Sequence, residues 1–300
     1  MKKALSALLA AVMVLGLLAL APITAHAATI EVANATEFGN AITNAANGDT
    51  IRLIANITCT STIEPPTAKT VTLDLNGNTL EAAAGIKLDG GAKRLLLADP
   101  TNGEFNVTGQ MVYGNGINVY DGCKAEISNV TLASGTCVWV QYGEAVVYGN
   151  ITNTGTASGV YVFNRGKVTV EGTIPDPTGG AYIHFGDTTK TAAQYTTPST
   201  KAGYKTYTDG SSTVWVKCAA HTFGEWVVDT QPTATTTGTK HRSCTACNFR
   251  EDGTIDATGG SGDDTGDYFK LWGKTTTYLK SNFWNWILLI FLFGWIWMAF

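Results

Sequence analysis

The chain has 300 residues, of which 15% are charged, and its formal net charge at pH 7 is −4. An ordinary soluble domain is about 25% charged, so the composition argues against a charged cytosolic helical enzyme, and the mild acidity gives no reason to expect nucleic acid as a partner. With 33 glycines, the sequence is typical of an exported protein rich in β structure and turns. Its length predicts about two domains.

Residues 1–27 predict a secretory signal peptide. A short basic start precedes an apolar run from Ala4 to Leu20, and Ala25-His26-Ala27 places small residues where a signal peptidase reads them. We expect cleavage before Ala28 and export through the secretory pathway. An uncleaved N-terminal anchor is the alternative.

A five-residue motif then recurs, with copies that start at Gly85, Gly116, Cys137, Gly159 and Gly180. The intervals between these starts are 31, 21, 22 and 21 residues. The longest interval is expected to carry an insertion between residues 99 and 109. After a turn glycine, a second strand is predicted in each central unit, over residues 124–127, 144–147 and 167–170.

Each copy alternates apolar and polar residues with period two, which predicts a β-strand with one buried face. One unit cannot bury that face alone, whereas stacked units can, and a period near twenty residues is typical of a solenoid. We therefore predict a mainly β chain with a parallel β-helix over residues 28–217. An antiparallel sandwich is the alternative, but it does not account for the near-constant period. The predicted inward pairs are Ile86/Leu88, Ile117/Val119, Val138/Val140, Val160/Val162 and Ala181/Ile183.

Residues 29–217 resemble the right-handed parallel β-helix, pectate-lyase-like superfamily of exported bacterial proteins. The resemblance rests on Thr36–Ile42, Gly48–Leu53 and Thr70–Leu80. It implies an amphipathic helix over the first of these segments, which caps the first coil, and a first strand launched by Gly-Asp-Thr-Ile. A cap is physically required because an open coil end would expose strand edges and core. Members of the superfamily are often polysaccharide lyases or hydrolases.

Such enzymes need acid/base carboxylates, or acidic calcium ligands with a basic residue, on the outer face of neighbouring coils. Only one carboxylate, that of Asp89, occurs in the two outward columns, so we assign no catalytic residue and expect a non-catalytic protein. A tethered lyase or hydrolase with residues in loops is the alternative. The columns read Lys87, Asn118, Trp139, Tyr161, Tyr182 and Asp89, Tyr120, Gln141, Phe163, His184.

Aromatic side chains dominate these columns. Strand spacing would place Trp139, Tyr161 and Tyr182 one above another, about 4.8 Å apart, with Tyr120 and Phe163 beside them. We call these five residues the aromatic stripe. An exposed apolar stripe is typical of a binding surface, and flat rings suit the apolar faces of sugars, so we predict that the stripe binds a polysaccharide or cell-surface glycan. An aromatic ladder that only stabilises adjacent strands is the alternative.

Asn-x-Thr triplets occur five times in the same region. They are glycan acceptors in exported eukaryotic or archaeal proteins. Asn is also common in turns and Thr at the start of strands, which is the interpretation we favour. The triplets begin at Asn34, Asn56, Asn106, Asn129 and Asn150.

Residues 218–256 predict a small Cys/His module. Cys218-Ala-Ala-His221, Phe223-Gly-Glu-Trp226 and Arg242-Ser-Cys244-Thr-Ala-Cys247 resemble a short repeat of surface proteins from Gram-positive gut-type bacteria. That repeat commonly has a cysteine where Ala234 stands and a glycine where Asn248 stands.

The module carries a candidate metal site made of Cys218, His221, Cys244 and Cys247. These are four ligands of the types that a closed tetrahedral zinc site uses, and three cysteines cannot all pair in disulfides within the module. Disulfides nevertheless persist in exported proteins. A structural zinc ion and a disulfide or free thiols are both open at this point.

The C-terminal part predicts a linker and juxtamembrane segment over residues 257–282 and a transmembrane helix over residues 283–300. Gly259–Gly266 has the composition of a flexible linker. The last 18 residues carry no charge and would span about 27 Å as a helix, with tryptophans toward both ends. A re-entrant or interfacial hairpin is the alternative. We expect a membrane-anchored surface protein, or alternatively a structural stalk or adhesin with protein contacts.

Overall fold

The structure is a computed structural model that describes residues 27–112, 114–175 and 182–258. The chain divides after Ala219 into two units, which we describe separately. The predicted transmembrane helix lies outside the described residues, and so do nearly all of the predicted signal peptide and nearly all of the predicted linker. Within those ranges, no helix is long and apolar enough to cross a membrane.

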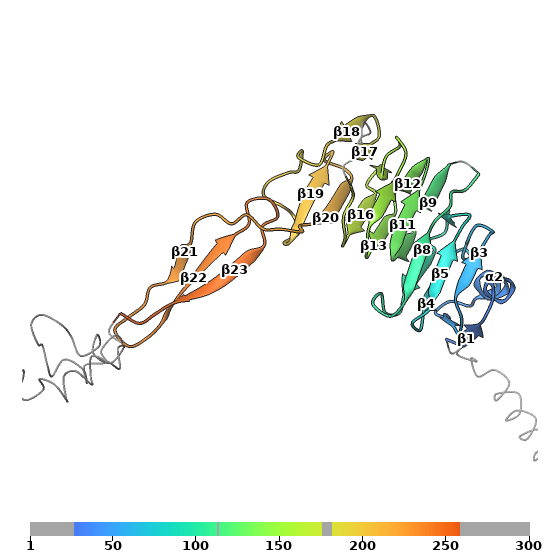
Figure 1. The fold of residues 1–300 in the computed structure, drawn as a ribbon, viewed down its shortest axis with the longest axis horizontal. Coiled ribbons are helices and arrows are strands. Elements are labelled where there is room, and N and C mark those ends of the chain that lie inside the picture. Colours follow the sequence, from blue (N-terminus) through green and yellow to red (C-terminus); the bar gives the residue numbers. More distant parts are fainter. Residues whose placement is uncertain (1–26, 113, 176–181, 259–300) are drawn as a thin grey trace, which may run out of the picture. The chain divides into compact units, whose positions relative to one another are not determined.

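The first unit is a parallel β-helix, as predicted, with about seven turns and three sheets that run along it (Figure 1). Among the described residues, sheet A contains, in order, β1 (Thr29–Val32), β2 (Thr50–Leu53), β4 (Thr70–Asp74), β7 (Arg94–Leu97), β10 (Lys124–Ile127), β13 (Glu144–Val147), β16 (Lys167–Val170), β20 (Thr213–Lys217) and β19 (Tyr204–Thr208). Sheet B contains β14 (Ile151–Asn153), β11 (Asn129–Leu132), β8 (Glu104–Val107), β5 (Thr79–Ala82) and β3 (Ile57–Cys59). Sheet C contains β18 (Thr188–Lys190), β17 (Ile183–Phe185), β15 (Val160–Phe163), β12 (Thr136–Gln141), β9 (Asn115–Tyr120) and β6 (Ile86–Leu88).

The register of sheet A measures the length of each coil. Paired residues on successive strands from β2 to β20 are separated by 22, 24, 30, 20, 23 and 46 residues. The 30-residue coil contains the predicted insertion, in the turns that flank β8. At the C-terminal end the strand pairs β17–β18 and β19–β20 are antiparallel, so the stacking direction of the coils is not continued beyond them.

The core lies inside the three sheets, where alternate side chains of each strand meet. The predicted inward residues of β6, β9, β12 and β15 are all fully buried, and so is Ile183; Ala181 lies outside the described residues. Tyr207, Phe38 and Phe105 are the largest fully buried side chains. Cys59, Cys123 and Cys137 are buried thiols outside any disulfide, and burial raises the pKa of the Cys59 thiol to about 11.

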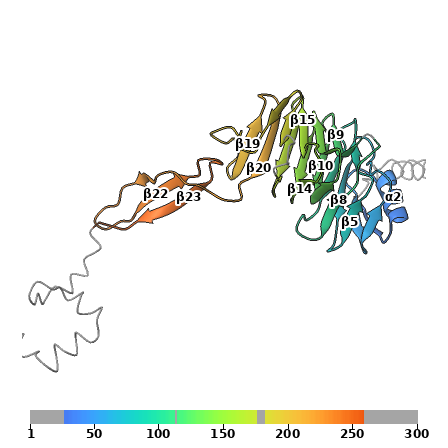
Figure 2. The ribbon, with the colours of Figure 1, turned by 45° about the horizontal axis from the view of Figure 1, so that its top comes forward.

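The N-terminal cap is α2 (Ala35–Asn44), the helix implied by the resemblance (Figure 2). Asn34 is its N-cap, since the Oδ1 atom accepts a hydrogen bond from the Glu37 amide at 3.0 Å. Phe38 and Ile42 face the core. The buried Asp49 carboxylate then accepts hydrogen bonds from the amides of Ala28 and Ala46, which explains the aspartate of the Gly-Asp-Thr-Ile segment.

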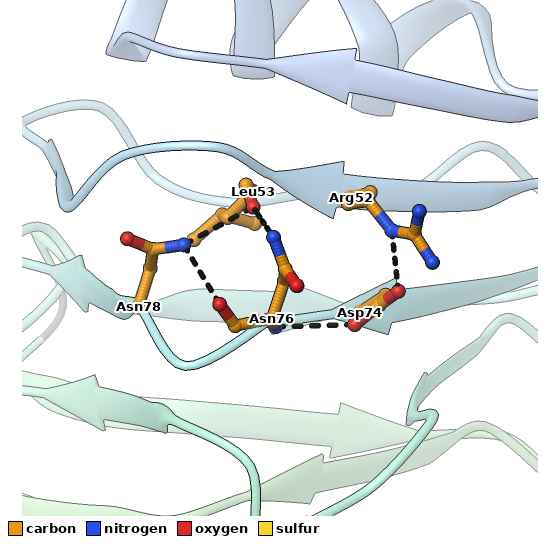
Figure 3. A network of polar contacts seen from close by, with 5 residues as sticks. All are labelled: Arg52, Leu53, Asp74, Asn76 and Asn78. Atoms are coloured by element: carbon orange, nitrogen blue, oxygen red, sulfur yellow. Dashed lines mark hydrogen bonds and ion pairs between the residues drawn. The ribbon is translucent and has the colours of Figure 1, made fainter.

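Asparagines hold the corner between sheets A and B. Figure 3 shows that the side-chain amides of Asn76 and Asn78 both donate to the Leu53 carbonyl of the preceding coil, at 3.1 Å. Beside them, Arg52 Nε donates to Asp74 Oδ2 at 2.7 Å. Asn76 itself has a left-handed backbone with φ of 50°, which asparagine tolerates better than most residues. These contacts tie the coil of β2 to the coil of β4.

The Asn-x-Thr asparagines make contacts of the same kind. Asn56 Oδ1 accepts from the Thr79 amide, Asn129 Oδ1 from the Asn150 amide, and Asn150 Oδ1 from the Thr173 amide, each at 2.9 Å. The triplets therefore have a structural role at the corners of the coil, as the favoured interpretation predicts.

Two buried side chains bridge the long third coil to the fourth. Strands β7 and β10 pair over only two residues, and beyond them the Leu97 amide donates to Glu126 Oε2 at 3.0 Å. Likewise the Phe105 amide donates to Ser128 Oγ at 2.9 Å. Because an unsatisfied buried amide is costly, these side chains replace the missing backbone partners where coils of unequal length meet.

We predict that Glu126→Ala destabilises the β-helix by about 1–3 kcal/mol, because it leaves the buried Leu97 amide without an acceptor. Glu126→Gln keeps a side-chain oxygen in place and should cost clearly less. Denaturant unfolding of both variants checks this, and equal losses would contradict the bridging role.

The second unit is a small antiparallel sheet, β21 (Val227–Thr230), β22 (Gly238–Ser243) and β23 (Arg250–Ile255), in that order. Its side chains are mostly exposed or half-buried. The Arg242 guanidinium lies over the rings of Phe223 and Trp226, at 4.4 and 4.8 Å. Such contacts stabilise a sheet of this size only modestly, so a further source of stability is expected.

Candidate functional site

The centre of the aromatic stripe forms as predicted, on the outer face of sheet C. Trp139 of β12 pairs with Tyr161 of β15, and their rings stack with centroids 4.1 Å apart and planes 3° from parallel. Phe163 lies beside this stack, 5.6 Å from each ring and nearly perpendicular to both. The Trp139 indole N–H is buried without a hydrogen-bond partner in the described structure, so ring stacking rather than a hydrogen bond positions this side chain.

The predicted position of Tyr182 is wrong. Tyr161 pairs with His184 instead, and the imidazole extends the stack, 5.6 Å and 19° from the Tyr161 ring. Tyr182 is only 6% exposed and packs inward, with its ring 5.5 Å from that of Tyr207. The register predicted for this coil was thus shifted by two residues.

The physical reason lies in where β17 begins. Tyr182 precedes the strand, which starts at Ile183, so the strand pleat does not fix its direction. Tyr207 closes the C-terminal end of the core, and Tyr182 fills the space beside it. A shift of two residues preserves the inward position of Ile183, so the alternating pattern alone could not detect it. Burial lowers the pKa of His184, which keeps this imidazole neutral at pH 7.

The other end of sheet C is polar. Tyr120 is half-buried, and the pKa of its phenol is raised by burial and by the nearby Asp89 carboxylate. Asn118, which pairs with Trp139, accepts a hydrogen bond from the Asn115 side chain at 3.0 Å. The outer face therefore changes from charged and amide groups at β6 and β9 to rings at β12, β15 and β17.

A further carboxylate, which the outward columns predicted from the sequence do not include, lies at this polar end. Lys87 Nζ is 3.4 Å from Asp89 and 3.9 Å from Glu64. Glu64 follows Ile63, which bridges to Ile86 of the next coil. The five-residue motif begins only at Gly85, so the preceding coil, which lacks it, gives no sequence signal for this glutamate. Both carboxylates are substantially exposed, and Lys87 lies near both of them. Glu64 makes its shorter ion pair with the buried Lys93, at 2.8 Å.

The four predicted metal ligands come together. One ligand atom from each of Cys218, His221, Cys244 and Cys247 lies within 4.8 Å of all the others. Tetrahedral ligands at a Zn–S distance of about 2.3 Å are nearly 4 Å apart, so a small contraction would close the set around an ion. Three thiols with one imidazole form a donor set of the kind found in structural zinc sites. The cluster could therefore hold a metal ion.

Local hydrogen bonds and packing favour the metal-binding form of these side chains. Burial raises the pKa of the Cys244 thiol, but hydrogen bonds from the Ala246 amide, His221 and Cys247 outweigh it and lower this pKa to about 6. Cys244 is thus largely thiolate at neutral pH, which is the metal-binding form. His221 Nδ1 is 3.1 Å from Cys247 Sγ, and the Phe249 ring stacks on the imidazole at 4.4 Å.

The turn after Cys247 explains one departure from the resembling repeat. Asn248 has φ of 55°, in the left-handed region where the repeat commonly has glycine. Asparagine tolerates this region. The Asn248 amide donates to the Cys244 carbonyl at 3.0 Å, so the loop between the two cysteines closes without a glycine.

Comparison of the chain with protein-family models, with curated proteins and with solved structures gave no match.

Proposed function

We propose that this is an exported, membrane-tethered surface protein whose β-helix binds a polysaccharide along the outer face of sheet C. The observation that carries the proposal is the ring cluster of Trp139, Tyr161, Phe163 and His184, with Tyr120 and polar side chains next to it on the same face. Rings and amides together supply the apolar and hydrogen-bonding contacts that a sugar polymer needs.

The geometry favours an extended ligand. The rings of Trp139 and Tyr161 cover each other's faces. A ligand therefore contacts the edges of these rings and the Phe163 side chain, rather than the face of one isolated ring. The outer residues from β6 to β17 lie on five neighbouring strands, a track of about 19 Å at the usual strand spacing. A linear chain laid parallel to the solenoid axis would contact polar groups at one end and rings at the other.

Alanine replacement of both Trp139 and Tyr161 tests the proposal. Aromatic residues at the centre of an interface commonly contribute 2 kcal/mol or more, so the double variant should lose at least about 30-fold in polysaccharide affinity. The ligand is first found on a glycan array probed with the full chain, and affinities are then compared by titration. Tyr142→Asn is the matched control, because Tyr142 is an exposed aromatic in a left-handed turn outside the cluster.

Three outcomes would contradict the proposal. Unchanged affinity in the double variant would place the ligand elsewhere. Release of unsaturated oligosaccharides from a bound polymer would instead favour a tethered lyase. Absence of glycan binding by the parent chain would favour a stalk or adhesin with protein contacts.

We further propose that the Cys218, His221, Cys244 and Cys247 cluster binds a structural zinc ion. Support comes from the donor set, the 4.8 Å limit on ligand separation and the lowered pKa of Cys244. The ion would hold together a sheet that has little core of its own.

A further inference from the structure

A cavity of about 200 Å³ lies where sheet C turns into sheet A. It is lined by side chains from four successive coils, together with the turn residues that precede β10 and β13. Four of its five charged groups are basic, although the whole chain is acidic. We call this cavity the basic corner, and its charged residues are Arg94, Lys124, Glu144, Arg165 and Lys167.

Most of this positive charge is not neutralised. Lys124 pairs with Glu126 at 3.1 Å and with Glu144 at 3.4 Å. Within the described ranges, no ion pair involves Arg94, Arg165 or Lys167. Arg94 also lies directly opposite Lys124 in the parallel register, and like charges at such positions destabilise a sheet. Glu144 lies opposite both Lys124 and Lys167 in the register, so one carboxylate is shared between two lysines and the cavity keeps an excess of positive charge.

The turn that precedes each strand of sheet A places Arg165 at the cavity. Arg165 stands two residues before β16 with φ of 65°, and the residues at the same place before β7, β10 and β13 are also left-handed: Ala92, Gly122 and Tyr142, with φ of 49°, 76° and 52°. The conformation is thus a property of the turn, and in this coil the turn carries a guanidinium that lines the cavity.

We propose that the basic corner binds a phosphate group. The guanidinium forks of Arg94 and Arg165 match the oxygens of a tetrahedral oxyanion, and three unpaired cations balance a doubly charged group better than a single carboxylate. The site is separate from the aromatic stripe and does not depend on polysaccharide binding there. The phosphate is either the free ion or a group carried on a surface polymer, and the chemistry of the site is the same for both.

Calorimetric titration of the full chain at constant ionic strength tests the proposal with three probes: inorganic phosphate, polyglycerol phosphate and acetate. We expect phosphate binding that Arg94→Gln weakens at least fivefold, and no comparable binding of acetate. Glu144→Gln removes the only carboxylate that lines the cavity and should tighten binding severalfold. Lys190→Gln, which removes a positive charge from β18, and Trp139→Ala should leave the affinity unchanged.

Arg165→Gly separates binding from folding. Because glycine relieves the left-handed strain, this variant should be at least as stable as the parent in thermal unfolding, and yet it should lose phosphate affinity at least fivefold. Tighter binding of polyglycerol phosphate than of the free ion would identify a polymer as the source, and the reverse order would identify the free ion. Absence of phosphate binding, equal binding of acetate, full affinity in the arginine variants, or weaker binding in Glu144→Gln would each overturn the proposal.

Discussion

Metal removal from the full chain is expected to unfold residues 221–256 and to leave the β-helix folded. The second unit buries few large apolar side chains, and its sheet has exposed or half-buried residues on all three strands. By contrast, the binding of structural zinc contributes an apparent free energy of about 10–16 kcal/mol in zinc-finger peptides. Loss of the ion would therefore remove the main source of stability of this unit.

Hydrogen exchange after treatment with a strong chelator measures the effect. Amide protection should be lost in β22 and β23, while the buried strands of sheet A keep theirs, and added zinc should restore it. Cys244→Ser should lower the zinc content and remove the same protection. Cys59→Ala is the control, because Cys59 is a thiol of the β-helix core and its loss should leave one zinc ion per chain.

Two results would contradict the zinc proposal. One is a zinc content far below one equivalent in the purified chain. The other is protection of β22 and β23 that persists after the chelator has removed all metal. A disulfide within the cluster would then account for the stability of the unit, and reductant rather than chelator should unfold it.

Sequence reasoning predicted two of the three sheets well. From β6 to β16, the strands of sheets A and C carry two inward apolar residues and follow a turn glycine, so the period is visible in the residues themselves. Sheet B was not predicted. Its strands β11 and β14 have four and three residues. Two of the Asn-x-Thr triplets begin at Asn129, the first residue of β11, and at Asn150, just before β14, and both asparagines make the corner bonds. These polar residues interrupt the alternation of apolar and polar residues, so the short strands of sheet B could not be predicted from the sequence.

The candidate sites show the same division. The metal ligands could be predicted because the short spacing in Cys-x-x-His and in Cys-x-x-Cys brings the two side chains of each pair close together. Tyr182 was misplaced because an alternating pattern fixes a register only to within two residues. The charge of the basic corner leaves no such signal, because Arg94, Arg165 and Lys167 belong to separate coils and come together only when the coils stack.

Phe105→Ala is expected to destabilise the β-helix by about 3–5 kcal/mol. The Phe105 side chain is fully buried and lies in the third coil, next to Leu80 of the second. Removing most of its side chain leaves a cavity that the surrounding strands can fill only in part. Phe105→Leu should cost much less. Val112→Ala, at a residue of the same coil that is 98% exposed, should cost nothing measurable.

Denaturant unfolding should also change in form. Each coil of a solenoid contacts only its neighbours, so a weakened interface in the interior couples the two sides less strongly. Because the third coil already relies on Glu126 and Ser128 for its bonds to the fourth, the cavity at Phe105 adds to an existing weakness there. The Phe105→Ala variant should therefore unfold in two steps, the coils before β7 separately from those after β10. A single transition with a loss below about 1 kcal/mol would show that the third coil is not the weak point of the β-helix.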